Sequence, residues 1–234
     1  MVTPETIAAY LARTTLFELL DDAQRQSIAR EMREAHFAAG ELLFGRGDPG
    51  REIYLVLEGR VRLSILSVEG REVSFVQAGP GALFGEIAAL DGGPRTADAT
   101  AVNPVRAVLL SHAALKRLIT AHSSVAAGAI KLLCARLRDA TDQLESIALY
   151  PIEVRLARYL LSAARQLRPQ SPSKSARVTI ELGMSQGDLA LFLGASRPKV
   201  NVALSALEAS GAIERQGTAI AIDIAALEQL VGAE

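Results

Sequence analysis

An apolar seam between residues 123 and 149 places the strongest constraint on the fold of this 234-residue chain. Its hydrophobic positions are separated alternately by four and three residues, which is the spacing of a coiled-coil helix. The seam continues for about three heptads and ends at Tyr150-Pro151, because proline cannot continue the hydrogen-bond ladder of a helix. We expect paired helices in a homodimer, although the face could instead pack within one chain. The seam consists of Ala126, Ile130, Leu133, Leu137, Ala140, Leu144 and Ile147.

Short β-rich runs alternate with glycine turns upstream of this helix, between residues 34 and 110. Such spacing favours a sandwich or barrel of antiparallel strands. Residues 4–33 instead favour short helices, one of them beginning at Asp21-Asp22, and Ser111 is a suitable N-cap for a helix through Ile119. The expected strands are 41–44, 52–57, 60–66, 72–78 and 105–110, with turns at 45–50, Glu58-Gly59, Glu69-Gly70 and 79–81.

Residues 84–98 interrupt the strands with a turn of unusual chemistry. Gly85 allows the backbone to approach a ligand closely, and the amides that open a short helix after it favour negative charge. Glu86 offers an acceptor for sugar hydroxyls, whereas Arg95 offers a planar donor pair for a phosphate and Thr96 adds a hydroxyl. The inventory fits a ligand with one phosphate and one free ribose hydroxyl. The alternative is a surface turn in which the arginine and the glutamate pair.

This stretch resembles the phosphate-binding cassette of cyclic-nucleotide-binding domains. The matching residues are Gly85-Glu86-Ile87-Ala88 and Arg95-Thr96-Ala97, at the spacing usual in that family. The resemblance implies a double-stranded β-roll, which is jelly-roll-like, around a cyclic nucleotide, cAMP or cGMP. It further implies a base contact from Thr141 on the long helix. The alternative is that apolar strand residues such as Leu63 and Phe75 mainly hold the base, which would leave cAMP as the working ligand.

The region after Pro151 contains the pattern of a helix-turn-helix. A helix is expected over 152–166, followed by a polar loop at 168–175 and a strand at 177–182. Ser185 is the expected cap of the next helix, Gly194-Ala195-Ser196 forms a tight turn, and a second helix begins near Pro198. The remaining elements are a hairpin around Gln216-Gly217-Thr218 and a closing helix capped by Asp223.

This half resembles the winged-helix domain of the CRP–FNR family of bacterial transcription regulators. Together with the cassette and the seam, the resemblance covers nearly the whole chain in the order of the family. It implies an α+β protein with three parts: a β-roll domain with flanking helices over 1–122, a dimerisation helix and hinge over 123–150, and a DNA-binding domain over 151–234.

In this motif the N-terminal residues of the second helix reach bases in the major groove. We expect Arg197 to be the cap residue, and Arg197 and Asn201 to share an outward face with Lys199 beside them. Arginine can address guanine and asparagine can address adenine. Many relatives carry a glutamate and a later arginine where this chain has Pro198 and Val202, and the valine can offer only an apolar contact. Phosphate contacts are expected from Ser185, Gln186 and Ser196.

The net charge of -1 argues against a nucleic-acid partner, but the distribution of charge along the chain favours one. Between residues 155 and 199 only Glu181 and Asp188 oppose eight basic residues, although a solvated face would have the same composition. The basic residues are Arg155, Arg158, Arg165, Arg168, Lys174, Arg177, Arg197 and Lys199.

Composition also argues against several other classes of protein. The single cysteine, Cys134, excludes an internal disulfide and a cysteine-only cluster, and the three histidines lack the short spacing of metal ligands. We expect no metal, no enzymatic activity and, because neither a signal peptide nor an apolar run of about 20 residues is present, a cytoplasmic protein.

The expected function is a homodimeric transcription regulator in which a cyclic nucleotide controls DNA binding through a hinge at 149–151. RNA polymerase is a further partner compatible with the resemblance. Ala140 and Thr141 occupy the positions that meet the adenine in the best-known cAMP receptors, so only the threonine can bond to the base. We therefore expect cGMP to bind at least comparably to cAMP. The alternatives are a haem or other small-molecule effector, or no effector.

Overall fold

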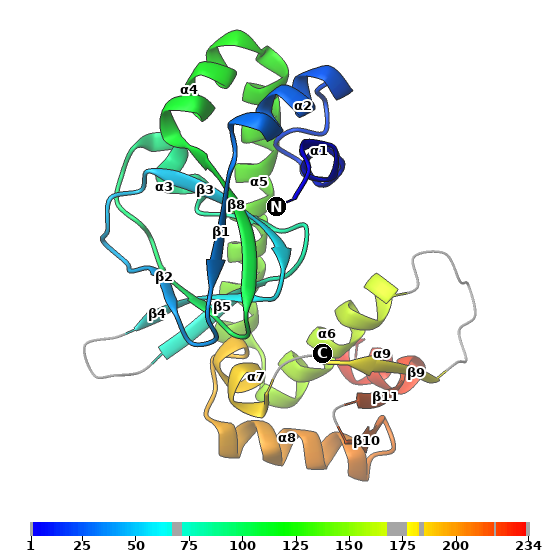
Figure 1. Ribbon diagram of the computed structural model, residues 1–234. Coiled ribbons are helices and arrows are strands. Elements are labelled where there is room, and N and C mark those ends of the chain that lie inside the picture. The colour runs from blue at the N-terminus through cyan, green and yellow to red at the C-terminus, as the bar shows by residue number, and fades with distance from the viewer. Residues whose placement is uncertain (1, 67–71, 168–176, 183–184, 218, 233–234) are drawn as a thin grey trace. The chain divides into compact units, whose positions relative to one another are not determined.

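The computed structural model describes residues 2–66, 72–167, 177–182, 185–217 and 219–232, without the side chains of Phe75, Gln166 and Leu167 (Figure 1). The turn expected at Glu69-Gly70, the loop at 168–175, Thr218 and the Phe75 side chain therefore lie outside the described residues. The chain forms two compact units, Met1–Ala140 and Thr141–Glu234. The helix α5, Ser123–Leu149, contributes to both units. The division into 1–122, 123–150 and 151–234 stays a prediction.

The N-terminal unit is built on two four-stranded antiparallel sheets. Residues from both sheets bury one cluster, in which the rings of Tyr54 and Phe84 stack with their centroids 5.0 Å apart. This arrangement confirms the α+β class and the β-roll. The first sheet has the order β1 (Arg33–Phe37), β8 (Val105–Ser111), β3 (Glu52–Glu58) and β6 (Leu83–Phe84); the second has the order β2 (Leu42–Phe44), β7 (Asp98–Ala101), β4 (Val61–Leu66) and β5 (Glu72–Ala78).

Three of these strands, β1, β6 and β7, are absent from the sequence prediction. Strand β6 has two residues, and β1 and β7 lack an alternating run of β-branched or aromatic residues. Each exists because a neighbour supplies hydrogen-bond partners, as where Ala99 of β7 pairs with Leu63 of β4. Strands of this kind depend on tertiary pairing rather than on intrinsic propensity.

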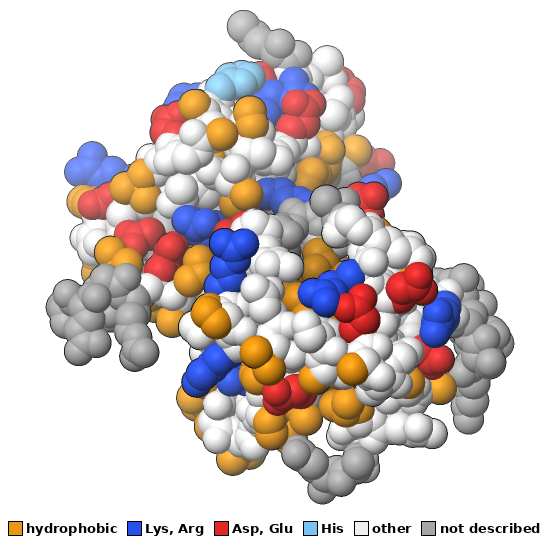
Figure 2. Space-filling model, turned by 90° about the horizontal axis from the view of Figure 1, so that it is seen from below, with side chains coloured by type: hydrophobic (Ala, Val, Ile, Leu, Met, Phe, Trp, Pro, Cys, Tyr) orange, Lys and Arg blue, Asp and Glu red, His pale blue; other side chains and the backbone are white. Residues whose placement is uncertain are grey.

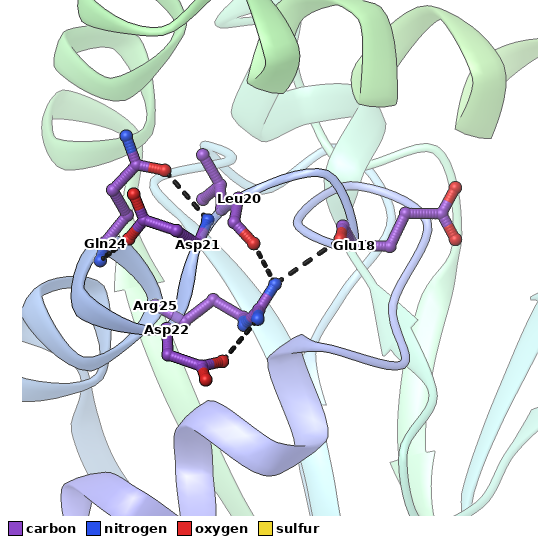
Figure 3. Close-up of polar contacts among 6 residues, drawn as sticks. All are labelled: Glu18, Leu20, Asp21, Asp22, Gln24 and Arg25. Atoms are coloured by element: carbon purple, nitrogen blue, oxygen red, sulfur yellow. Dashed lines mark hydrogen bonds and ion pairs between the residues drawn. The ribbon is translucent and has the colours of Figure 1, made fainter.

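The short helices expected from the sequence are present, and they share a hydrophobic cluster with one face of the first sheet. They are α1 (Pro4–Leu11), α2 (Asp22–Glu31) and α4 (His112–Ala121). Asp21 caps α2 through a reciprocal capping box: its carboxylate accepts from the Gln24 backbone at 2.8 Å, and the Gln24 side chain accepts from the Asp21 backbone at 3.0 Å (Figure 3). Ser111 caps α4 by accepting from the Ala114 backbone at 3.2 Å.

The C-terminal unit is a winged helix-turn-helix. A three-stranded antiparallel sheet in the order β10-β11-β9 packs with the helices around one buried cluster. The Asp223 carboxylate accepts from the Ala226 backbone at 3.0 Å and so caps the last helix. The elements are α6 (Ile152–Leu167), β9 (Arg177–Glu181), α7 (Gln186–Phe192), α8 (Arg197–Ala209), β10 (Ile213–Gln216), β11 (Ala219–Asp223) and α9 (Ile224–Gly232).

Within the described ranges, no single helix is both long and apolar enough to cross a membrane. Only α4 and α5 taken together reach the required length and composition, and they are bent by 116°.

Gly50 lies where a loop approaches the helix α3 (Glu86–Asp91) too closely for a side chain. A Cβ atom at residue 50 would lie 2.0 Å from the Cβ of Ala88, 3.0 Å from the carbonyl oxygen of Gly93 and 3.1 Å from the carbonyl carbon of Ala88. The loop is also hydrogen-bonded to the segment after α3, since the Arg95 backbone donates to the Asp48 carbonyl at 2.8 Å. The missing side chain therefore fixes the distance between this loop and α3.

We predict that Gly50→Ala lowers the free energy of unfolding of the N-terminal unit by about 1–3 kcal/mol, because backbone must move to admit the methyl group. Chemical denaturation followed by circular dichroism measures the change. Gly79→Ala is the matched control, because no atom lies within 4 Å of a Cβ built there. Equal stability of the two variants would contradict the close approach.

Candidate functional site

Helix α3 is flanked at both ends by a residue whose backbone conformation favours glycine. Gly85 precedes α3 with a φ of 77°, and Gly92 follows it with a φ of 75°. A Cβ at residue 85 would also lie 2.7 Å from Nη1 of Arg95. Glycine at this position therefore serves the conformation of the turn and the close approach of the arginine.

The Arg95 side chain is buried within the cassette, with 4% of its surface exposed. Nη1 donates to the carbonyl oxygen of Gly85 at 2.9 Å, and Nη2 donates to the carbonyl oxygen of Glu52 at 2.8 Å. The guanidinium carbon lies 4.1 Å from the ring centroid of Phe44 and 5.5 Å from that of Tyr54, which is cation–π geometry. The arginine thus joins the turn to β3 and to the aromatic cluster.

The fit of Arg95 to an anion can be judged from the donors that the protein leaves unused. Its Nε atom is buried and has no hydrogen-bond partner among the described residues. Burial lowers the pKa of the Arg95 guanidinium from its ordinary value, against the raising influence of Tyr54 and Glu52, and the same burial raises the pKa of the Tyr54 hydroxyl. A desolvated cation with an unused donor is stabilised by an anionic acceptor, so the residue suits a phosphate.

Glu86, the first residue of α3, is also buried, with 5% of its surface exposed. Its Oε1 accepts from Nε of Arg136 at 2.8 Å, and Nη2 of Arg136 donates to the carbonyl oxygen of Leu83 at 2.9 Å. Arg136 belongs to α5 and is absent from the predicted site. A buried carboxylate requires a partner, but the sequence does not indicate which basic residue supplies it.

The other predicted ligand residues differ in their surroundings. Within the cassette, Ile87 and Thr96 are exposed, whereas Ala88 is buried against Gly50. Leu63 is buried in the cluster that contains Tyr54 and Phe84. Thr141 is exposed and belongs to the second unit, so the structure does not place it against the cassette. The structure therefore brings Gly85, Glu86, Ala88 and Arg95 together, with Ile87 and Thr96 adjoining them.

In the second unit, Ser185 caps α7 as predicted. Its hydroxyl accepts from the Asp188 backbone at 3.1 Å, and the Ser185 backbone donates to the Asp188 carboxylate at 3.3 Å. The neighbouring Gln186 is exposed. Capping occupies the Ser185 hydroxyl, so Gln186 is the freer of the two for a phosphate contact.

The turn between α7 and α8 is anchored from α6 and from the end of α5. Gly194 has a φ of 61°, and a Cβ there would lie 3.1 Å from Cδ1 of Ile147. Arg155 donates from Nη1 to the carbonyl oxygen of Leu193 at 2.7 Å. A residue of the predicted seam, Ile147, therefore contacts the turn that precedes the second helix.

The helix α8 begins one residue earlier than predicted. Ser196 is the N-cap, with a φ of -81° and a ψ of 149°, and Arg197 is already helical. The prediction that Arg197 caps the helix is therefore wrong. Pro198 does not prevent this start, because the first N–H groups of a helix have no intrahelical partner and proline lacks only that group.

The outer surface of α8 differs from the predicted one in one respect. Arg197, Lys199 and Ser196 are exposed, but Asn201 is half-buried and its Oδ1 is buried without a partner among the described residues. The exposed side of α8 is mixed rather than uniformly basic, because Val202 is exposed together with Arg197 and Lys199. Figure 2, which views the molecule from below, likewise shows hydrophobic, basic and acidic side chains interspersed.

The hairpin of β10 and β11 is tied to the end of α8 by an ion pair. Nε of Arg215 donates to Oε2 of Glu208 at 2.8 Å, and this hydrogen bond lowers the pKa of the Glu208 carboxyl. Both side chains are on the surface, so the pair contributes little to stability. Its effect is to orient the wing relative to α8.

The apolar seam of α5 is largely exposed. Leu137 and Leu144 each have 69% of their surface exposed, and Ile130 has 64%. Helices that leave such a stripe uncovered have unburied hydrophobic area available for a partner.

Among the residues that the structure describes, no group of three or more His, Cys, Asp or Glu side chains could hold a metal ion.

Two family descriptions match the sequence. Residues 34–122 match the cyclic nucleotide-binding domain, and residues 154–230 match the Crp-like helix-turn-helix domain. The chain is 30% identical over 212 residues to the CRP-like cAMP-activated global transcriptional regulator of Mycobacterium tuberculosis, covering 91% of this chain and 93% of that protein.

A second relative is the cyclic AMP receptor protein of Thermus thermophilus, which is 33% identical over 196 residues, covering 83% of this chain and 86% of the relative. Among solved structures, FixK2 of Bradyrhizobium japonicum is similar with a TM-score of 0.73 and 25% identity, covering 85% of this chain and 96% of that one.

We predict that Arg136→Ala lowers the free energy of unfolding of the N-terminal unit by about 1–3 kcal/mol, because the Glu86 carboxylate would remain buried without its partner. Thermal or chemical denaturation measures the loss. Arg138→Ala is the control, since Arg138 is exposed on the same helix. The double variant Glu86→Gln with Arg136→Ala should recover part of the loss, and a fully additive double variant would show that the two residues do not interact.

Proposed function

The chain belongs to the CRP–FNR family of bacterial transcription regulators, and from that premise we propose that it is a homodimer whose binding to DNA is controlled by a cyclic nucleotide in the β-roll. The observation that supports the ligand is the cassette, in which Arg95 is buried with an unused Nε donor and Glu86, nine residues earlier in the chain, is a buried carboxylate. In this proposal Arg95 binds the phosphate and Glu86 accepts from the ribose 2′-hydroxyl. The names of two relatives, cAMP-activated and cyclic AMP receptor, support the same class of ligand.

The dimer in this proposal is a parallel pair of α5 helices. The exposed residues at spacings of four and three are the a and d positions of a two-stranded coiled coil, where apolar side chains interdigitate. Arg136 and Thr141 then occupy g and e positions five residues apart, which meet across such a dimer. The pairing would bring Thr141 of one copy beside Arg136 of the other, next to Glu86.

The ligand would act through this helix pair. Arg136, at the middle of α5, binds the cassette, and Ile147, near the C-terminal end of α5, contacts the turn before α8. A nucleotide that prefers one arrangement of the pair would therefore shift the population of the DNA-competent state. The hinge at 149–151 remains part of the proposal.

DNA binding in this proposal uses α8 in the major groove. Arg197 addresses a guanine, while Lys199, Gln186 and the Ser196 hydroxyl contact phosphates. The predicted contact of Asn201 with an adenine would require its buried Oδ1 to turn outward on binding. Ser196 makes no side-chain capping bond, which leaves its hydroxyl available. Ser185 caps α7, and in this proposal the first turn of α7 then faces the DNA phosphates.

The nucleotide in this proposal is cGMP as well as cAMP. Thr141 supplies the single hydroxyl on α5 near the base, and Thr96 beside Arg95 can bond to a guanine amino group when the base is syn. In the alternative, Leu63 and Phe75 mainly hold the base and cAMP is the working ligand. Calorimetric titration of nucleotide-free protein with each nucleotide tests this directly: a preference for cAMP above about tenfold contradicts it.

The central experiment selects DNA from a random pool with no nucleotide, with cAMP and with cGMP. We expect one symmetric sequence to be enriched in the presence of a bound nucleotide. Enrichment of the same sequence to the same degree in every condition, together with no heat of nucleotide binding, would instead indicate another effector or constitutive binding.

We predict that Arg95→Ala weakens nucleotide binding by about 2 kcal/mol or more, which is roughly thirtyfold, because a buried charge-assisted contact to the phosphate is lost. Arg95→Lys should restore only part of the affinity, since lysine lacks the planar donor pair. Calorimetry measures both, with denaturation checking that the variants fold. Arg46→Ala is the control, because Arg46 is an exposed arginine in the adjoining loop. Unchanged affinity in Arg95→Ala would contradict the assignment of Arg95 to the phosphate.

We predict that Leu144→Glu weakens self-association by at least tenfold, because it places a charge at an apolar a position of the seam. Analytical ultracentrifugation over a concentration series measures the change. Leu149→Glu is a matched control: Leu149 is as exposed as Leu144, at 69% each, but lies outside the spacing of the seam. If both variants dissociate equally, the seam is not the interface.

A further inference from the structure

The exposed aliphatic residue Val202 stands out on the surface of the C-terminal unit. Its exposed fraction is 65%, and outside α5 it is the one large hydrophobic residue of this unit that the structure describes as exposed. Single apolar residues on a surface are common, so exposure alone would carry no conclusion. What distinguishes Val202 is its position on α8.

The two sides of α8 have different roles. Val200, Ala203, Leu204 and Leu207 are buried in the core of the unit and hold the helix in place. Val202 points away from that core, and the exposed Pro198 lies four residues before it. Residues four apart lie on the same face of a helix, so the two form a small apolar surface one turn long.

Basic side chains lie next to this apolar surface. Arg197 and Lys199 are exposed on either side of Pro198 in the first turn of α8. Their charge favours a polyanion, whereas the apolar strip cannot donate or accept a hydrogen bond. A β-branched residue also gains nothing intrinsically from an exposed helical position, because its χ1 is restricted there. The combination suits a partner that presents both phosphates and a methyl group.

We propose that Val202, supported by Pro198, reads the C5-methyl group of a thymine in the major groove. The inference rests on the proposed function, since it requires α8 to lie in that groove. The thymine methyl is the one apolar group that base edges present there, and an aliphatic side chain contacts it without a hydrogen bond. Val202 is then a specificity-determining residue that separates thymine from cytosine at one position in each half-site.

The test removes the methyl group and changes nothing else in the hydrogen-bonding pattern. The sequence enriched by selection is prepared with each thymine replaced singly by uracil, and affinities are measured by fluorescence anisotropy at constant salt. Loss of one buried methyl group corresponds to about a fourfold loss of affinity. We expect this loss at one thymine in each half-site and little change at the others.

The variant Val202→Ala completes a double-mutant cycle with the uracil substitution. It should fold normally, because residue 202 is exposed and alanine favours helix, and it should bind thymine and uracil sites equally. Lys199→Ala is the matched control on the same helix: it should weaken binding to both sites while preserving the fourfold difference between them.

Each outcome has a separate meaning. Failure to enrich any sequence, with or without nucleotide, would overturn the proposed function itself. Sequence-specific binding in which uracil is tolerated at every position, or in which Val202→Ala keeps the wild-type sensitivity to uracil, would overturn the assignment of Val202 while leaving the proposed function intact.

Discussion

The buried guanidinium of Arg95 is the interaction on which the candidate ligand site depends. It bonds to the carbonyls of Gly85 and Glu52 and lies over the ring of Phe44, so the turn before α3 is held against β3. A side chain at residue 85 would displace it. Because burying a charge is costly, this geometry requires compensation, which the carbonyl dipoles and aromatic faces supply in part.

Helix α5 combines several constraints in one continuous element. On one side Arg136 neutralises the buried Glu86; along another the apolar residues repeat at four and three; near its end Ile147 contacts Gly194 in the turn before α8. A substitution in this helix is rarely local in effect, because neighbouring residues contact different parts of the protein. The same property makes the helix suited to link ligand binding with DNA binding in the proposed function.

Prediction from sequence succeeded where local chemistry was sufficient. Caps at Asp21, Ser111 and Ser185 were found from side chains that compete for free amides, and the long helix from its regular apolar spacing. It failed at β1, β6 and β7, which depend on neighbouring strands. It also placed the start of α8 one residue late, because the residue before a proline is biased against helix, whereas Arg197 before Pro198 is already helical.

The sequence by itself determined the helices of the two units, the cassette residues and the apolar spacing of α5, because each is expressed in residues close together along the chain. Only the tertiary structure decided that Arg136 is the partner of Glu86, fifty residues away, and that Ile147 contacts Gly194. It also decided that Asn201 is half-buried while Val202 is exposed. Long-range pairings and burial depend on how the elements pack, and helical or strand periodicity does not specify which distant residue fills each contact.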